Sequence, residues 1–459
     1  MTTVSAQERT VLGHPRGLFL LFGTEAWERV QYYGMRAFLV LFLVDRVHGL
    51  GWNESRALTL YGWYTGLSYL STVAGGWAAD RFLGQRRAVV IGGTLMMLGQ
   101  FLCALKMEPL LYVGGAVLIG GNGLFKANIS TMVGQLYRPG DPRRDGGFTI
   151  FYVGINLGAA VGPFLCGTLA EKVDWSLGFA SAGLGMAVGV LLFVLLRGRL
   201  LPPEVGAPPP GEHTRATRGV VPRGPLTREE RDRIIVIFVL TFFVAIFWAG
   251  YEQGGGLMNL FTDRSTDRSL LGHEIPTTWF QAVNSGFIFL LAPGFAALWT
   301  RLAEAGKEPS TGRKMALGLL ALAASFVLLF LAARRAEAVG RAGMLWMVGA
   351  YCFQTVGELM LSPVGLSMVT KLAPARYASA LMGVWFLSNA AGNKLAGSVG
   401  ALAEGHGDAT VFLGIALGST AAGAILFALG PALHRMTHGA EDVTPDLAGA
   451  ASGPATASS

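Results

Sequence analysis

Charged residues are scarce in this 459-residue chain: they make up only 14% of it, whereas hydrophobic residues make up 52%. Soluble domains carry about 25% charged residues. A chain this apolar cannot cover itself with a water-facing surface, so lipid or other helices must meet its side chains. The composition therefore excludes a small soluble enzyme, a disordered polymer and a disulfide-stapled secreted domain, and it indicates an all-α integral membrane protein in a lipid bilayer.

Cysteine and histidine are scarce as well. Cys103, Cys166 and Cys352 lie far apart in apolar runs, which predicts buried free thiols and neither a disulfide framework nor a metal cluster. The seven histidines all fall in predicted connections or tails. A membrane enzyme would need a metal cluster or a nucleophile and base near the midplane, so the sequence disfavours an enzyme and predicts no metal and no cofactor.

Long apolar segments are abundant. A window of about 20 residues places twelve predicted spans. They lie at 17–44, 57–79, 88–105, 109–137, 147–170, 175–196, 234–261, 277–300, 314–333, 343–370, 377–402 and 410–433. The proline-rich, arginine-rich segment between the sixth and seventh spans reads as a hydrophilic linker.

The predicted organisation is therefore two six-helix bundles. A cytoplasmic N-terminus (1–16) with no cleaved signal peptide precedes the first bundle (17–197). The linker (198–233) leads to the second bundle (234–435), and a disordered cytoplasmic tail follows (436–459). Two bundles joined in this way are typical of transporters that rock one half against the other around a midplane site.

The net charge of +7 is distributed in a way that predicts topology. Lysines and arginines concentrate in the connections and tails on one side, which does not indicate a nucleic-acid partner. The positive-inside rule then places both termini in the cytoplasm of a multi-pass protein of the inner (plasma) membrane. We expect a functional monomer.

The first span carries an unusual charged face. Glu25, Glu28, Arg29, Tyr32, Tyr33 and Arg36 share one side of a helix. A lipid-facing charge costs at least about 2.5 to 3.5 kcal/mol, so this face is expected to line a polar cavity. Two carboxylates beside an arginine form a suitable proton relay of Glu25, Glu28 and Arg29. The alternative is an ion-paired helix interface that binds no substrate.

The same residues resemble a family signature. Glu25-Ala-Trp-Glu28-Arg29-Val30-Gln-Tyr32-Tyr33 is similar to the E-x-x-E-R-F-x-Y-Y motif of the proton-dependent oligopeptide transporter (POT/PTR) family, with Val30 in place of Phe. That family belongs to the major facilitator superfamily. Further similar motifs begin at Gly76 (the generic facilitator loop), Phe125, Phe151 and Gly357. Bacterial members commonly insert two extra helices between the bundles, for which this linker has no apolar run.

The resemblance implies the major facilitator fold with twelve transmembrane helices and proton-coupled symport of di- and tripeptides into the cell by alternating access. A zwitterionic peptide needs two charged subsites about 5 to 10 Å apart. Arg29 and Lys126 would take the carboxylate, and Glu358 would take the ammonium. The substrate-binding set is predicted to be Arg29, Tyr32, Tyr33, Tyr69, Lys126, Asn156, Trp248, Asn284, Glu358, Trp385 and Phe386.

Two cross-bundle salt bridges are predicted to act as gates. Arg36 and Glu252 both lie towards the outer ends of outward-running spans, so their depths match. Lys126 and Glu358 are single opposite charges on facing bundles, where an unpaired charge would be costly. Lys394 receives no role.

Two other functions remain open at this level. One is a facilitator for another small solute, such as nitrate, an amino acid or a drug-like peptide mimic. The other is a transport-dead peptide sensor that binds without cycling. The acidic residues favour a peptide over an inorganic anion, because an anion has less need of Glu358 and of the relay carboxylates.

Overall fold

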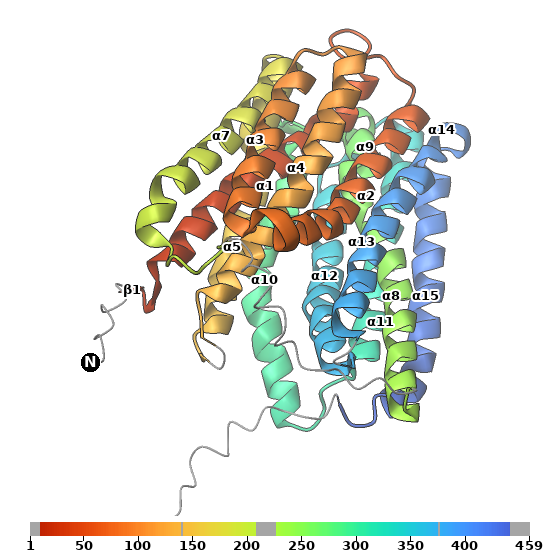
Figure 1. Ribbon diagram of the computed structural model, residues 1–459. Coiled ribbons are helices and arrows are strands. Elements are labelled where there is room, and N and C mark those ends of the chain that lie inside the picture. Colours follow the sequence, from red (N-terminus) through yellow and green to blue (C-terminus); the bar gives the residue numbers. More distant parts are fainter. Residues whose placement is uncertain (1–9, 139–140, 208–225, 375–376, 441–459) are drawn as a thin grey trace, which may run out of the picture.

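The structure is a computed structural model that describes residues 10–138, 141–207, 226–374 and 377–440. Within these residues, twelve long helical segments stand side by side, six before and six after the predicted linker (Figure 1). The first segment begins at the lower end in Figure 1 and runs to the upper end, the second returns, and this alternation continues along the chain. Half of the predicted linker and most of the tail predicted to be disordered lie outside the described residues.

The first bundle is built from six long segments with short turns between them. They are α1 (Arg16–Val44), α2 (Glu54–Ala78), α3 (Gln85–Ala104), α4 (Glu108–Gln135), α5 (Arg144–Gly162) and α7 (Trp175–Leu200). A wide turn, η1 (Ala79–Leu83), extends α2, and a second one, η2 (Pro163–Gly167), joins α5 to the short α6 (Thr168–Lys172). Asn53 and Asp174 accept backbone amides at the starts of α2 and α7, which fixes where these helices begin.

The second bundle repeats this arrangement. Its long segments are α8 (Arg228–Tyr251), α10 (Trp279–Glu304), α11 (Thr311–Val339), α12 (Leu345–Leu372), α13 (Ala378–Ala401) and α15 (Asp408–Met436). The short pieces are η4 (Glu252–Gly255), α9 (Leu257–Ser265) and α14 (Ala403–His406). Thr227 and Glu230 form a reciprocal capping box that starts α8.

Two-residue strands pair in the connections. β1 (Thr10–Val11) pairs with β2 (His14–Pro15), and β4 (Ser269–Leu270) pairs with β5 (His273–Glu274), both antiparallel. β3 (Thr266–Asp267) and β6 (Ala342–Gly343) pair in parallel. These pairs are too short to alter the all-α class that the sequence predicts.

Eight of the long segments in the described residues are apolar and long enough to cross a membrane by composition alone. α1 is not among them because its charged residues Glu25, Glu28, Arg29 and Arg36 interrupt every window. The charges that make α1 unusual in the sequence are therefore also the reason that hydropathy alone does not identify it as a membrane span.

The seventh predicted span, 234–261, is not one continuous helix. α8 ends at Tyr251, a tight turn follows at Glu252–Gly255, and α9 resumes at Leu257. Three consecutive glycines, Gly254 to Gly256, explain the break, since glycine stabilises a helix poorly and tolerates unusual backbone angles. The break places Glu252 at the end of α8.

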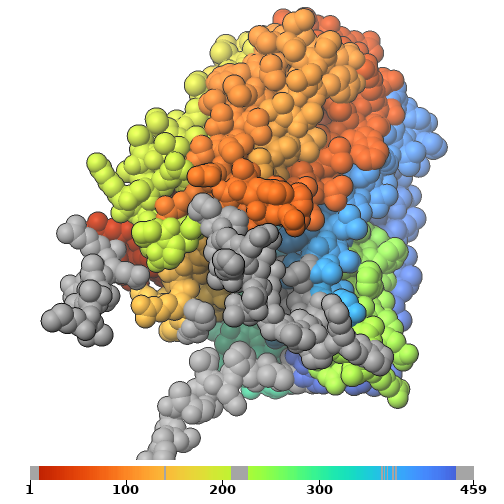
Figure 2. Space-filling view, viewed as in Figure 1, coloured from red at the N-terminus to blue at the C-terminus, as the bar shows by residue number. Residues whose placement is uncertain are grey.

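There are two buried apolar cores. One is formed mainly by side chains of α1 to α7, together with Leu260 of α9, and the other by side chains of α8 to α15. Figure 2 shows the two halves on separate parts of the surface, meeting along a seam. α2 and α13 pack closely across that seam: a Cβ added to Gly62 would lie 2.8 Å from the Cα of Gly397. Glycine at both positions permits this close approach.

Polar contacts also join the bundles. Arg36 pairs with Glu252, Asn259 donates to the carbonyl of Ala37 at 2.7 Å, and the amide of Ser55 donates to Glu404 at 2.7 Å. Arg264 bridges Glu54 of the first bundle and Asp408 of the second. All of these involve the second half of α1 or the start of α2, towards the upper end. The structure is therefore closed at that end.

Candidate functional site

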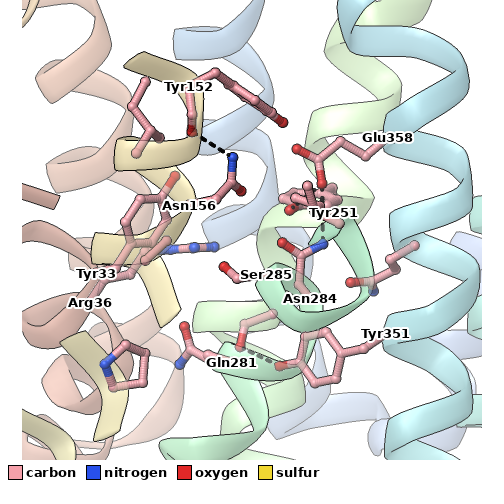
Figure 3. Close-up of a pocket in the computed structure, with 16 residues that line it drawn as sticks. Tyr33, Arg36, Tyr152, Asn156, Tyr251, Gln281, Asn284, Ser285, Tyr351 and Glu358 are labelled. Atoms are coloured by element: carbon pink, nitrogen blue, oxygen red, sulfur yellow. Dashed lines mark hydrogen bonds between the residues drawn. The ribbon is translucent and has the colours of Figure 1, made fainter. Parts of the chain in front are cut away.

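A cavity lies between the two bundles, lined by α1 and α5 on one side and by α8, α10 and α12 on the other (Figure 3). It contains about 670 Å³ of empty space, part of it open to solvent. Its lining side chains that can hydrogen-bond are Tyr33, Arg36, Tyr152, Asn156, Tyr251, Gln281, Asn284, Ser285, Tyr351, Gln354 and Glu358.

Glu358 lies on the α12 wall of this cavity with neutral donors around it. The hydroxyl of Tyr251 donates to its Oε2 at 2.8 Å, and the amide of Asn284 donates to the same oxygen at 3.1 Å. Thr355 accepts a second bond from Asn284 at 2.9 Å. Figure 3 shows Tyr251 and Asn284 converging on the carboxyl group. This arrangement orients a carboxylate without neutralising it, so it can hold an ammonium group of a ligand.

Arg36 and Glu252 form the predicted cross-bundle pair. Nη2 of Arg36 lies 2.6 Å from Oε2 of Glu252, and both side chains are buried. The hydroxyl of Tyr61 accepts a bond from Nε of Arg36 at 2.8 Å. A Cβ at Gly255 would lie 2.2 Å from that hydroxyl and 3.0 Å from Nε of Arg36, so only glycine leaves room for the pair.

Glu25, Glu28 and Arg29 form a buried cluster on α1. Nε of Arg29 lies 3.0 Å from Oε1 of Glu25 and also pairs with Glu28, and all three side chains are at most 2% exposed. Within the described part of the chain, Oε2 of Glu25, Oε1 of Glu28 and Nη2 of Arg29 make no hydrogen bond. The cluster carries one excess negative charge when fully ionised, and it retains groups that can accept a proton.

Lys126 belongs to this cluster rather than to Glu358. Its ammonium interacts electrostatically with Glu25 and Glu28 and lies 4.0 Å from the centre of the Tyr69 ring. Between the described residues no ion pair joins Lys126 to Glu358. The predicted salt bridge between Lys126 and Glu358 is therefore not formed in this structure. Glu358 accepts hydrogen bonds from Tyr251 and Asn284 of its own bundle, whereas Lys126 lies near groups of the first bundle. The pair stays a prediction for another conformation.

The remaining predicted residues are spread around the cavity and its surroundings. Tyr33 and Asn156 line it, and Asn156 donates to the carbonyl of Tyr152 at 3.0 Å. Tyr32 packs edge to face against Tyr33. The other predicted members, Arg29, Tyr32, Tyr69, Lys126, Trp248, Trp385 and Phe386, are not among the residues that line this cavity.

The aromatic residues differ in their surroundings. Trp248 packs against Tyr251, with 5.1 Å between ring centres, and Trp385 is buried. Phe386 is 40% exposed. Lys394 donates to Ser398 at 2.6 Å and lies 4.8 Å from the Trp63 ring across the seam, outside the cavity lining.

Sequence reasoning missed several cavity residues. They are Tyr152, Gln281, Ser285, Tyr351 and Gln354. These are neutral polar side chains on ordinary helices, and only the packing of the bundles shows which of them face the cavity.

The chain matches the family model described as "POT family" over residues 86–200 and 225–410. It is 38% identical to a peptide transporter of Yersinia enterocolitica, in an alignment that covers 85% of this chain and 88% of that protein. It is 35% identical to a di-/tripeptide transporter of Lactococcus lactis subsp. cremoris, covering 85% of this chain and 90% of the relative.

Solved structures show the same similarity in three dimensions. A crystal structure of a peptide transporter POT in complex with sulfate superposes with a TM-score of 0.87 at 37% identity, covering 94% of this chain and 98% of that one. A POT family transporter in complex with 5-aminolevulinic acid superposes with a TM-score of 0.85 at 29% identity, covering 93% and 98%.

Proposed function

The chain belongs to the POT family, and from this premise we propose that it imports di- and tripeptides together with protons by alternating access. Relatives that align over most of their length are named peptide and di-/tripeptide transporters. The fold, with two bundles around a central cavity, suits a transporter and not an enzyme.

The observation that carries proton coupling is the buried cluster of Glu25, Glu28 and Arg29. Its excess negative charge is costly away from water, so a proton or the ammonium of Lys126 must offset it. Carboxyl oxygens without hydrogen bonds are available to take that proton. A peptide carboxylate bound to Arg29 and Lys126 would offset the positive charge that these residues present to Glu25 and Glu28. Peptide binding would then favour protonation of the cluster, and protonation would favour peptide binding.

The peptide ammonium is assigned to Glu358, whose carboxyl group faces the cavity in a frame of neutral donors. Tyr33, Asn156 and Asn284 lie where they can hydrogen-bond the peptide backbone or its ends. Tyr32, Tyr69, Trp248, Trp385 and Phe386 are proposed to offer apolar surface to the side chains once the peptide is bound. Surfaces of this kind bind varied side chains because they impose few directional contacts.

Arg36 and Glu252 are proposed as the gate at the upper end, which we assign to the outside of the inner membrane, with both termini in the cytoplasm. The buried pair holds the outer side closed, and a proton on Glu252 would weaken it and favour opening. Lys126 and Glu358 are the corresponding candidates at the cytoplasmic side. We propose that the functional unit is a monomer.

The decisive experiment is uptake of labelled dialanine into proteoliposomes, with and without an inward proton gradient. We expect accumulation only with the gradient and its loss when an ionophore collapses the gradient. Binding without uptake would indicate a sensor, and uptake that ignores the gradient would contradict proton coupling.

A competing small zwitterion is worth testing in the same assay, because one POT family structure holds 5-aminolevulinic acid. That molecule carries an amine and a carboxylate as a peptide does. If it, nitrate or a drug-like peptide mimic were accumulated while dialanine was not, the peptide assignment would be wrong although the family assignment would hold.

A further inference from the structure

The start of α10 is held by a residue of the other bundle. The carboxylate of Glu171, at the end of α6, accepts the backbone amide of Thr277 at 2.8 Å through Oε2. Its Oε1 accepts the amide of Thr278 at 2.8 Å and the hydroxyl of Thr278 at 2.6 Å. One carboxylate of the first bundle thus receives three hydrogen bonds from the N-terminus of a helix in the second.

α10 has no cap of its own. Its N-cap residue, Thr278, makes no side-chain bond to the helix, because its hydroxyl donates to Glu171, and the first turn contains no acidic residue. By contrast, α8 is capped by its own Thr227 and Glu230. The amides at a helix start need an acceptor and carry partial positive charge, so an anion at this place stabilises the helix. For α10, the anion comes from across the seam.

Neighbouring contacts hold the same junction. The indole nitrogen of Trp279 donates to the hydroxyl of Thr168 at 2.8 Å, and its ring packs edge to face on Phe164. On the second-bundle side, Thr277 donates to Asp263 at 2.9 Å. The segment around the start of α10 therefore contacts both bundles: Thr277 binds Asp263 of its own bundle, and Trp279 binds Thr168 of α6 in the other.

The position of α10 depends strongly on the contacts at its N-terminal end. Only 17% of its span is buried, whereas the other candidate spans of the described residues are 39 to 56% buried. Its first turns nevertheless carry Gln281, Asn284 and Ser285 into the cavity, and Asn284 contacts Glu358. A helix with few packing contacts is placed by the contacts that remain, so the junction at Glu171 affects where these side chains lie.

We propose that Glu171 is a positioning residue: it caps α10 across the seam when the upper end is closed, and it thereby stabilises closure and holds the first turns of α10 at the cavity. This inference rests on the proposed alternating access, in which the upper end opens and closes. Opening must separate α6 from α10 and leave the helix start without its anion. The contact thus exists only in the closed state.

The test measures how fast a reagent added outside the cell reaches a residue of the cavity. Ser285→Cys is placed in a background in which Cys103, Cys166 and Cys352 are replaced by alanine, and intact cells are treated with a membrane-impermeant maleimide. With Glu171 present, we expect slow labelling. Glu171→Ala should label about tenfold faster, the ratio that corresponds to about 1.4 kcal/mol, within the range for loss of a helix cap. Glu171→Gln, which keeps an acceptor but loses the charge, should label at an intermediate rate.

Glu108→Ala is the matched control. Glu108 is another acidic residue at the upper end, but its partners Arg56 and Trp52 belong to its own bundle. Its loss should leave the labelling rate unchanged. If Glu171→Ala labelled no faster than Glu108→Ala, the proposal would be wrong, even if Glu171→Ala had a lower melting temperature.

Should Glu171→Ala fail to fold, Thr278→Val against Thr278→Ser decides the matter, since only serine keeps the hydroxyl that donates to Glu171. Faster labelling with valine alone supports the cap, and equal labelling overturns it. Labelling requires neither a peptide nor a proton gradient. Failure of dialanine uptake would therefore count against the proposed substrate and leave this result intact.

Discussion

Arg36 and Glu252 form a buried ion pair between α1 and the turn that ends α8, with Nη2 and Oε2 2.6 Å apart. The pair joins the two bundles and is supported by Tyr61, whose hydroxyl lies 2.8 Å from Nε of Arg36. A charge left alone in such a place costs about 3 to 5 kcal/mol. The proposed role of this pair as an outside gate can therefore be tested by changing either residue.

The first prediction concerns the gate. Arg36→Ala and Glu252→Ala should each reduce peptide uptake at least tenfold, because either leaves an unpaired buried charge and weakens closure. The swapped protein, Arg36→Glu with Glu252→Arg, should recover part of the activity. Tyr61→Phe should have a smaller effect, about 0.5 to 1 kcal/mol, which is less than tenfold. Initial uptake rates measure all four, and a swap no better than either single variant would refute the pairing as a gate.

The second prediction concerns coupling. Glu28→Gln should abolish gradient-driven accumulation while some counterflow exchange remains, because the amide cannot take up a proton but leaves the cavity in place. Both fluxes are measured in the same proteoliposomes. Gln31→Asn, on the same helix but not an ionisable position, is a suitable control and should keep the gradient response. Normal accumulation by Glu28→Gln would remove the relay role.

The third prediction concerns the ends of the peptide. Amidation of the carboxyl end or acetylation of the amino end should weaken competition for dialanine uptake by about 1.5 kcal/mol or more, since each removes a charge-assisted hydrogen bond. Competition curves with free, singly blocked and doubly blocked dipeptides measure this. Equal competition by all of them would show that the site does not read the charged ends.

The fourth prediction separates Glu358 from Lys126. Tyr251→Phe removes one donor from Glu358 and should weaken binding of free dipeptides by about 0.5 to 1.5 kcal/mol, with little effect on N-acetylated ones. Combined with Glu358→Gln it should be non-additive, whereas combined with Lys126→Ala it should be additive, because Lys126 lies at another cluster. Additive effects of Tyr251→Phe and Glu358→Gln would indicate that the observed contact does not serve binding.

The sequence by itself determined the class of the protein, the positions of its long helices and the charged face of α1. These follow from local rules: apolar length defines a span, and a helical period of 3.6 residues puts Glu25, Glu28, Arg29 and Arg36 on one side. Matching depth along two helices was enough to predict that Arg36 meets Glu252. Family motifs supplied the expected transport activity.

Tertiary structure decided which groups on distant helices meet. Three features depend on how the helices are rotated and packed against each other. They are the contacts of Tyr251 and Asn284 with Glu358, the position of Lys126 near Glu25 and Glu28, and the contact of Glu171 with the start of α10. Neutral hydroxyl, amide and backbone groups occur on every face of these helices, so spacing along the chain does not distinguish those that meet. The packing of the two bundles makes that selection, because a buried polar group is stable only where a partner lies within hydrogen-bonding distance.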